Sequence, residues 1–238
     1  MISDHMLNLF DSWQKLLFTE YAGQDICDEY LIYNKKIIIS DCDGILTDGG
    51  HYYTESGKKM KRFGSCDKEA MRFMMKCKWK FLFVTDDPSG YSITGQRLKD
   101  WNVSSIRLSD VIKEYWTPDD AGYELTSFYA YPDQAPETRF VPHVSSSSRV
   151  EIVKAFKEAG YYVAFLGDSM SDLAAAEHAN LFCTIDNALD LVKENADIVS
   201  NKCGGFGGFA DLMYKIHWRT GNQYSGIPSI LEKVSNIQ

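Results

Sequence analysis

Two aspartates at the end of an apolar stretch are the residues of this sequence best suited to chemistry. The stretch 36–41 is rich in β-branched residues, a pattern typical of a buried strand, and Asp41 and Asp43 end it just before Gly44. Ligands of α/β sheets bind beyond the carboxyl ends of strands, and residues i and i+2 of a strand face the same way. Two carboxylates held close together repel unless a cation or a shared proton compensates them, and the spacing therefore predicts a divalent metal site. A plain surface turn is the alternative, because Asp and Gly are also ordinary turn residues.

Two further strand-like runs also end in polar residues. The run 81–85 ends in a threonine, and the run 162–166 is followed by Asp168, with Asp172 four residues later. If these runs are parallel strands, their carboxyl ends meet at one edge of the sheet. We therefore expect these side chains to gather around Asp41.

The joint pattern resembles a known superfamily. Asp41-x-Asp43-Gly-x-Leu-Thr-Asp-Gly is similar to motif I of the haloacid dehalogenase (HAD) superfamily, Thr85 to motif II, and the Gly-Asp-x-x-x-Asp of residues 167–172 to motif IV. Motif I is most similar to the small-cap branch that includes 3-deoxy-D-manno-octulosonate 8-phosphate phosphatase. Three motifs in the right order, each after an apolar strand, are far more specific than any one of them.

The resemblance implies a division of roles among these residues. Asp41 would be the nucleophile and Asp43 the general acid/base, which agrees with the chemistry of carboxyl groups. Thr85 would bind the transferring phosphoryl oxygens, and Gly44 would lie against the substrate. The cofactor implied is Mg²⁺, which prefers oxygen ligands. The expected metal residues are Asp41, Asp43 through its backbone carbonyl, Asp168, and Asp172 in a supporting role.

Motif III of the superfamily requires a cation that offsets the charge of the carboxylates and the phosphate. The usual residue is Lys, but here Arg149 stands at about the right place, after a run of serines that can cap a helix. Lys154 lies one turn further along. We expect Arg149 to fill this catalytic position, with the stricter fork geometry of a guanidinium.

A β-hairpin over about residues 50–62 is predicted to form a flap over the site. Lys61 in this flap is a candidate substrate contact, although charged residues there are also typical of a solvated strand edge. Asp86 replaces the more usual Gly after motif II. Its charge would repel an anionic substrate unless the side chain points away or binds hydroxyl groups of the substrate. Asp86 is therefore a second candidate for a substrate contact. Asp67 is equally well explained as a helix N-cap or as part of a family pattern.

The predicted organisation is one catalytic domain with additions. The resemblance implies an α/β, Rossmann-like three-layer sandwich with a mainly parallel sheet over residues 36–218. Residues 1–35 read as a helical extension, and 219–238 as a C-terminal arm. Residues 111–148 are predicted to be a small insertion in place of a full cap, because a long plain loop inside a domain is uncommon.

Composition excludes several classes of function. The net charge of −8 argues against nucleic-acid binding, and no apolar run is long enough for a membrane helix. The N-terminus lacks the features of a signal peptide, and the six cysteines form no Cys-x-x-Cys pair. We therefore expect a cytoplasmic protein. The resemblance further implies a homo-oligomer, a tetramer in the related enzymes.

The function predicted from the sequence is that of a Mg²⁺-dependent phosphomonoesterase. It would act through an aspartyl phosphate on a small phosphorylated metabolite, a sugar or sugar-acid phosphate. A nucleotide phosphatase of the same fold is one alternative. The other is a HAD-fold binding or scaffold protein with weak catalysis, which the missing motif III Lys and the acids after Thr85 would favour.

Overall fold

A sheet of seven parallel strands is the centre of the computed structural model, which describes residues 35–108, 111 and 138–221. The strand order is β5-β6-β4-β1-β7-β8-β9. The strands are β1 Lys36–Asp41, β4 Trp79–Thr85, β5 Ser104–Ser105, β6 Thr138–Pro142, β7 Tyr162–Leu166, β8 Leu181–Thr184 and β9 Ile198–Val199. The expected N-terminal extension and most of the C-terminal arm lie outside the described residues.

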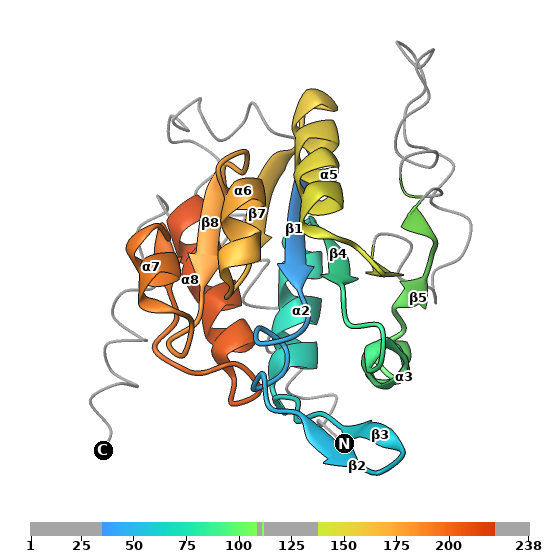
Figure 1. Cartoon of the computed structure of the whole chain (residues 1–238). Helices are drawn as coiled ribbons and strands as arrows, with labels where there is room; N and C mark the ends of the chain where they lie inside the picture. Colours follow the sequence, from blue (N-terminus) through green and yellow to red (C-terminus); the bar gives the residue numbers. More distant parts are fainter. Residues whose placement is uncertain (1–34, 109–110, 112–137, 222–238) are drawn as a thin grey trace, which may run out of the picture. The chain divides into compact units, whose positions relative to one another are not determined.

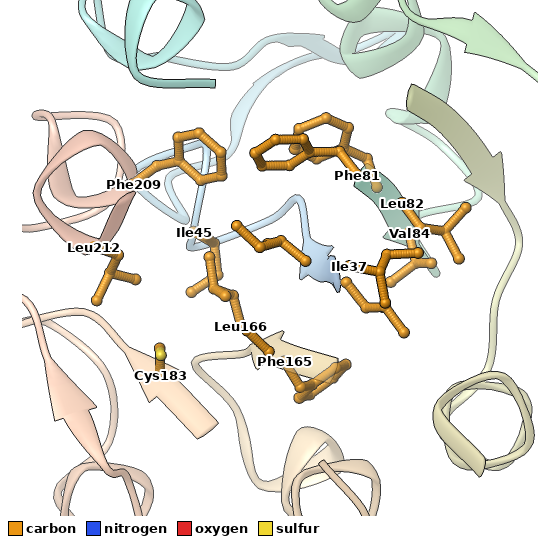
Figure 2. Close-up of a cluster of buried hydrophobic side chains, with 14 of the residues drawn as sticks. Ile37, Ile45, Phe81, Leu82, Val84, Phe165, Leu166, Cys183, Phe209 and Leu212 are labelled. Atoms are coloured by element: carbon orange, nitrogen blue, oxygen red, sulfur yellow. The ribbon is translucent and has the colours of Figure 1, made fainter. Parts of the chain in front are cut away.

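Helices cover both faces of the sheet, which confirms the predicted α/β sandwich. Figure 1 shows α5 and α6 on one face and α2 and α8 on the other. Figure 2 shows the matching core, with Phe81 and Phe209 on one side of β1 and Phe165 on the other. The helical elements are α2 Asp67–Lys76, α3 Tyr91–Lys99, α5 Ser146–Glu158, the 3₁₀ turn η2 Met170–Asp172, α6 Leu173–Ala176, α7 Asp190–Glu194 and α8 Gly208–Gly221.

The central strand β1 explains why the functional residues meet. Ile37, Ile38 and Ile39 are fully buried, as expected for a parallel strand covered on both faces. In the ladder, β1 lies between β4 and β7, with Asp41 opposite Val84 and Ser40 opposite Leu166. The residues that follow each of these strands therefore emerge at one edge of the sheet, where ligands of such folds bind.

The flap has the expected hairpin form. Strands β2 (Tyr52–Thr54) and β3 (Gly57–Met60) pair antiparallel, and Gly57, the first residue of β3 after the turn, has a φ of +99°. An isolated bridge between Thr47 and Phe63 closes its base. In Figure 1 the hairpin lies beyond the carboxyl end of β1.

The sheet resumes earlier than the predicted insertion would allow. Strand β6, which lies within the range 111–148, pairs in parallel with β4, and its residue Phe140 is buried. The short sequence Thr-Arg-Phe-Val-Pro carries only a weak strand signal, because its burial depends on β4 and β5. Residues 112–137 lie outside the described part of the chain. The described helices include none long and apolar enough to cross a membrane.

Candidate active site

Three carboxylates gather at the sheet edge where β1 and β7 end. Oxygen atoms of Asp41, Asp168 and Asp172 lie within 4.8 Å of one another. Asp41 is 5% exposed and Asp172 is fully buried. The structure thus places these acidic residues, which the sequence analysis chose from separate motifs, in one cluster.

Arg149 is the cation of this cluster. It lies in the first turn of α5, which begins after Ser145, whose hydroxyl accepts a hydrogen bond from the Ser148 amide. The guanidinium of Arg149 lies 3.2 Å from Asp41 Oδ1 and also pairs with Asp172. Lys154 is exposed, so the structure places Arg149 at the position that the sequence analysis assigned to it.

Asp172 holds the loop that carries Asp168. Its Oδ2 accepts hydrogen bonds from the backbone amides of Asp168 and Ser169, at 3.2 and 3.1 Å, and from the Ser169 hydroxyl at 2.7 Å. Its Oδ1 faces Arg149. Asp172 therefore contacts both the loop that carries Asp168 and the cation Arg149.

The charge of the cluster fits a divalent cation. Three carboxylates face one guanidinium, so two negative charges are left without a partner within the cluster. Burial raises the pKa of Asp41 well above its usual range, and Asp172, Asp168 and Asp43 raise it further while Arg149 opposes them. Burial and the neighbouring Asp172 raise the pKa of Asp168 to about 7. Oxygen ligands with surplus negative charge are the donor set that Mg²⁺ requires.

The metal-free protein should lose stability as the pH rises from about 4 towards 7. An unfolded Asp releases its proton near pH 3.9, whereas folded Asp168 keeps it up to about pH 7. The folded state therefore binds the extra proton in this window, and ionisation disfavours folding. Thermal unfolding in EDTA should show a lower melting temperature at pH 7.5 than at pH 5, and Asp168→Asn should reduce the difference. If the melting temperature falls equally between pH 5 and pH 7.5 in wild type and in Asp168→Asn, Asp168 is not the group responsible for the loss of stability.

Gly44 fits against Asp168 because it has no side chain. Its φ is +88°, and a Cβ placed there would lie 2.0 Å from Asp168 Oδ2. The Gly44→Ala change should therefore displace the carboxylate and weaken Mg²⁺ binding about tenfold or more, besides about 1–2 kcal/mol of backbone strain. Gly57→Ala is the matched control, since Gly57 has a φ of +99° and open space around its Cβ. Calorimetric titration with Mg²⁺ should separate the two, and equal affinities would contradict the prediction.

Asp43 points away from this cluster towards a second set of polar groups. The hydroxyl of Thr85 donates to Asp43 Oδ2 at 2.8 Å, and the ammonium of Lys61 lies 2.6 Å from Oδ1. The Asp43 side chain is 23% exposed. Among the described residues, the clustered carboxylates do not include that of Asp43, so its expected metal contact is left to its backbone carbonyl.

The flap lysines reach the acid that the sequence analysis did not choose. Lys58 and Lys61 lie 2.5 and 2.8 Å from Asp87 Oδ2, whereas the candidate Asp86 is exposed. These lysines lower the pKa of Asp87, although burial acts in the opposite direction. Asp87 Oδ1 also accepts from the Gly90 amide just before α3. The sequence carried no signal that separates Asp87 from Asp86, because both acids follow the same strand.

The glycine-rich segment 203–208 packs against motif I. A Cβ at Gly204 would lie 1.7 Å from the carbonyl oxygen of Gly44, so this close approach requires glycine. The Gly204 amide donates to Asn187 Oδ1 at 3.0 Å. Next in the loop, Phe206 lies under the guanidinium of Arg62, 3.7 Å from its ring centroid.

Solved structures of similar fold confirm the resemblance at the level of the fold. The cobalt-bound deoxy-D-mannose-octulosonate 8-phosphate phosphatase of Haemophilus influenzae is 20% identical, with a TM-score of 0.56 over 83% of this chain and 97% of that one. The 3-deoxy-D-manno-octulosonate 8-phosphate phosphatase of Moraxella catarrhalis, solved with magnesium, phosphate and KDO, is 17% identical, with a TM-score of 0.58 over 90% and 100%. A putative HAD superfamily (subfamily III A) hydrolase of Legionella pneumophila is 18% identical, with a TM-score of 0.57 over 91% and 93%.

Sequence comparison reaches less far than comparison of folds. No family model matches the chain. A probable cation-transporting P-type ATPase of Mycoplasma pneumoniae is 29% identical over 108 residues, which are 45% of this chain but 12% of that protein. The chain thus spans only a small part of this curated relative. This chain shares the fold of the solved phosphatases and the hydrolase compared above, as motifs I, II and IV predicted.

Proposed function

We propose that this protein is a Mg²⁺-dependent phosphomonoesterase that acts through an aspartyl phosphate on Asp41. The observation that supports it best is the placement of Asp41 in a buried cluster with Asp168, Asp172 and Arg149. Asp43 stands two residues away, with its carboxyl group held separately. Such a site offers a nucleophile, a charge-balancing cation and an acid/base in distinct environments.

Two transfers of the phosphoryl group make up the proposed reaction. A carboxylate oxygen of Asp41 attacks phosphorus, the bond from phosphorus to the leaving oxygen breaks, and the carboxyl group of Asp43 protonates that oxygen. Asp43 then takes a proton from water, which attacks phosphorus and regenerates Asp41 with release of phosphate. Thr85 and Lys61 hold the two oxygens of Asp43, so its orientation is set before the substrate arrives.

The residues that would hold the metal are Asp41, Asp168 and the backbone carbonyl of Asp43. When bound, Mg²⁺ would supply positive charge that stabilises the phosphoryl oxygens as negative charge develops on them. Arg149 adds a fixed cation beside Asp41, and Asp172 keeps both Arg149 and Asp168 in place. The fold-similar Moraxella enzyme contains magnesium and phosphate, which supports this choice of metal.

The alternative of a catalytically weak binding protein rested on two departures from the family pattern. One was Arg149 in place of Lys, and it pairs with Asp41 as a motif III cation should. The other was the pair of acids after Thr85, and Asp87 is neutralised by Lys58 and Lys61. Both departures are thus compatible with catalysis, which favours the enzyme.

The proposed substrate is a small phosphorylated metabolite, a sugar or sugar-acid phosphate rather than a nucleotide. The neighbours in fold that are named for 3-deoxy-D-manno-octulosonate 8-phosphate support this class. We also propose that the protein is cytoplasmic and forms a homo-oligomer, as the resemblance of its motifs implies. Neither nucleic acid nor membrane is a proposed partner, given the net charge of −8.

Hydrolysis of p-nitrophenyl phosphate tests the proposed function. Activity should be abolished by EDTA and restored by Mg²⁺, because the carboxylate cluster is otherwise uncompensated. Asp168→Asn should raise the Mg²⁺ concentration needed for half-maximal activity about tenfold or more. Asp190→Asn is the control, since the Asp190 side chain is 90% exposed on α7. Failure of the wild-type protein to hydrolyse the ester with Mg²⁺ present would overturn the proposal.

A further inference from the structure

The residues around Asp43 form the part of the site that the leaving group of a substrate would contact. Under the proposed function, Asp43 protonates the leaving oxygen, so the leaving group must lie against its carboxyl group. That carboxyl group is bordered by Lys61 of the flap and by Thr85 at the end of β4. The charge available around Asp43 therefore decides which leaving groups are accepted.

Lys61 has no hydrogen-bond donor to spare. An ammonium group has three donors, and that of Lys61 meets three acceptors, at 2.6 Å in Asp43, 2.8 Å in Asp87 and 3.0 Å in Thr94. Its side chain is 1% exposed. A substrate carboxylate could therefore bind Lys61 only by breaking one of these contacts.

Both carboxylate oxygens of Asp87 also have hydrogen-bond partners, and the negative charge of Asp87 offsets the positive charge of Lys58, the second flap lysine. Its Oδ2 accepts from Lys58 and Lys61, and its Oδ1 accepts from the amides of Ser89 and Gly90 and from the Ser89 hydroxyl. The Lys58 side chain is 3% exposed. Two lysines, Lys58 and Lys61, thus face two aspartates, Asp43 and Asp87. This second cluster, at the flap, has no surplus positive charge.

We propose, on the basis of the proposed function, that the protein selects phosphomonoesters whose leaving group is uncharged and hydroxylated, such as a neutral sugar or polyol, over carboxylate-bearing ones. A carboxylate placed beside this cluster would lose water without gaining a cation, which is costly. A hydroxyl group loses less and can donate to a carboxylate. Asp86, the exposed neighbour of Asp87 in the chain, adds a further negative charge to this segment.

Arg62 is the rival cation, because it follows Lys61 directly and is exposed. Its guanidinium stacks on Phe206 of the glycine-rich segment at 3.7 Å. There it lines a hollow of about 470 Å³ together with Lys202 and Tyr214, whereas Lys61 points to Asp43. The residues lining this hollow do not include Asp43, and the experiment includes a variant that tests Arg62.

Matched pairs of substrates test the inference with the full-length protein and Mg²⁺. Glycerol 3-phosphate is compared with 3-phosphoglycerate, and glucitol 6-phosphate with 6-phosphogluconate, each pair differing only by a carboxylate in place of a CH₂OH group in the leaving group. The neutral member should have a kcat/KM higher by about tenfold or more. Where a pair is not turned over, its members are compared as competitive inhibitors of p-nitrophenyl phosphate hydrolysis, with the same expected order.

Charge variants of the cluster should move this preference in opposite directions. Asp87→Asn leaves two lysines with one aspartate and should improve the relative kcat/KM of the anionic member several-fold. Lys58→Gln removes a cation and should worsen it, so the inference stays testable if the Asp87 variant does not fold. Lys59→Gln is the control with the same charge change, because Lys59 is exposed on the same strand, and the ratio should stay unchanged.

The outcomes distinguish this inference from the proposed function. No hydrolysis of p-nitrophenyl phosphate would overturn both. If that ester is hydrolysed but the carboxylate-bearing substrates have a kcat/KM equal to or higher than their neutral counterparts, the selectivity alone is overturned. If Arg62→Gln then lowers the kcat/KM of the carboxylate-bearing substrates, Arg62 is the cation that recognises them. Ratios that do not change in both Asp87→Asn and Lys58→Gln would also overturn it.

Discussion

Replacing Asp41 with Asn should lower kcat for p-nitrophenyl phosphate by about a thousandfold or more, because an amide is a far poorer nucleophile than a carboxylate. The two side chains are nearly equal in size, so the buried position can accept the change. The amide also removes one of three clustered negative charges. The metal-free variant should therefore unfold at the same temperature as wild type or higher, while its activity is lost.

This combination separates loss of chemistry from loss of fold. A variant that is inactive because it is unfolded would melt at a lower temperature. The exposed Asp190 again serves as the control position, and Asp190→Asn should retain both activity and stability. An Asp41→Asn protein with wild-type kcat would show that Asp41 is not the nucleophile.

Replacing Arg149 with Met should reduce both stability and activity. Arg149 is 5% exposed and pairs with Asp41 and Asp172, and removal of one partner from a buried pair costs about 3–5 kcal/mol. Loss of a cation aimed at the reacting group should lower kcat by about a hundredfold or more. Arg149→Lys should retain part of the activity, because it keeps the charge but cannot pair with both carboxylates in a fork.

Urea unfolding at pH 7.5, with and without Mg²⁺, measures the stability effect. Mg²⁺ should restore part of the stability lost in Arg149→Met, since it supplies charge to the same carboxylates. Arg219→Met is the control. The Arg219 guanidinium is half exposed, lies 3.8 Å from the Asp197 carboxylate and donates to the Asp197 carbonyl oxygen at 2.8 Å, and loss of such exposed contacts should cost about 1 kcal/mol or less. A cost as small as this for Arg149→Met would contradict the role assigned to the residue.

The core of the site could be predicted from the sequence because it depends on local patterns. Apolar runs that end in Asp41, Thr85 and Asp168 predict parallel strands, and a parallel sheet brings the ends of such strands together. Arg149 was chosen because of the resemblance to motif III, and the serines before it predicted the start of the helix that carries it. The strand ends needed only apolar runs and the general geometry of a parallel sheet, whereas the cation needed the resemblance.

The flap contacts could not be predicted because they depend on how the hairpin docks. Nothing in the order Asp86-Asp87 says which acid faces the lysines, and the answer comes from the packing of β3 on the start of α3. Strand β6 was missed for a related reason, since its burial comes from its neighbour β4. Tertiary contacts of this kind override the weak signal of a short segment.

Trapping the acyl phosphate tests the central proposal most directly. Wild-type protein turning over p-nitrophenyl phosphate with Mg²⁺ is quenched in acid and treated with borohydride, which reduces an acyl phosphate to an alcohol. Peptide mass spectrometry should find the side chain of Asp41 converted to that of homoserine, and no such product without substrate. Turnover without any reduced Asp41, or reduction at a different carboxylate, would contradict the proposal that Asp41 carries the phosphoryl group.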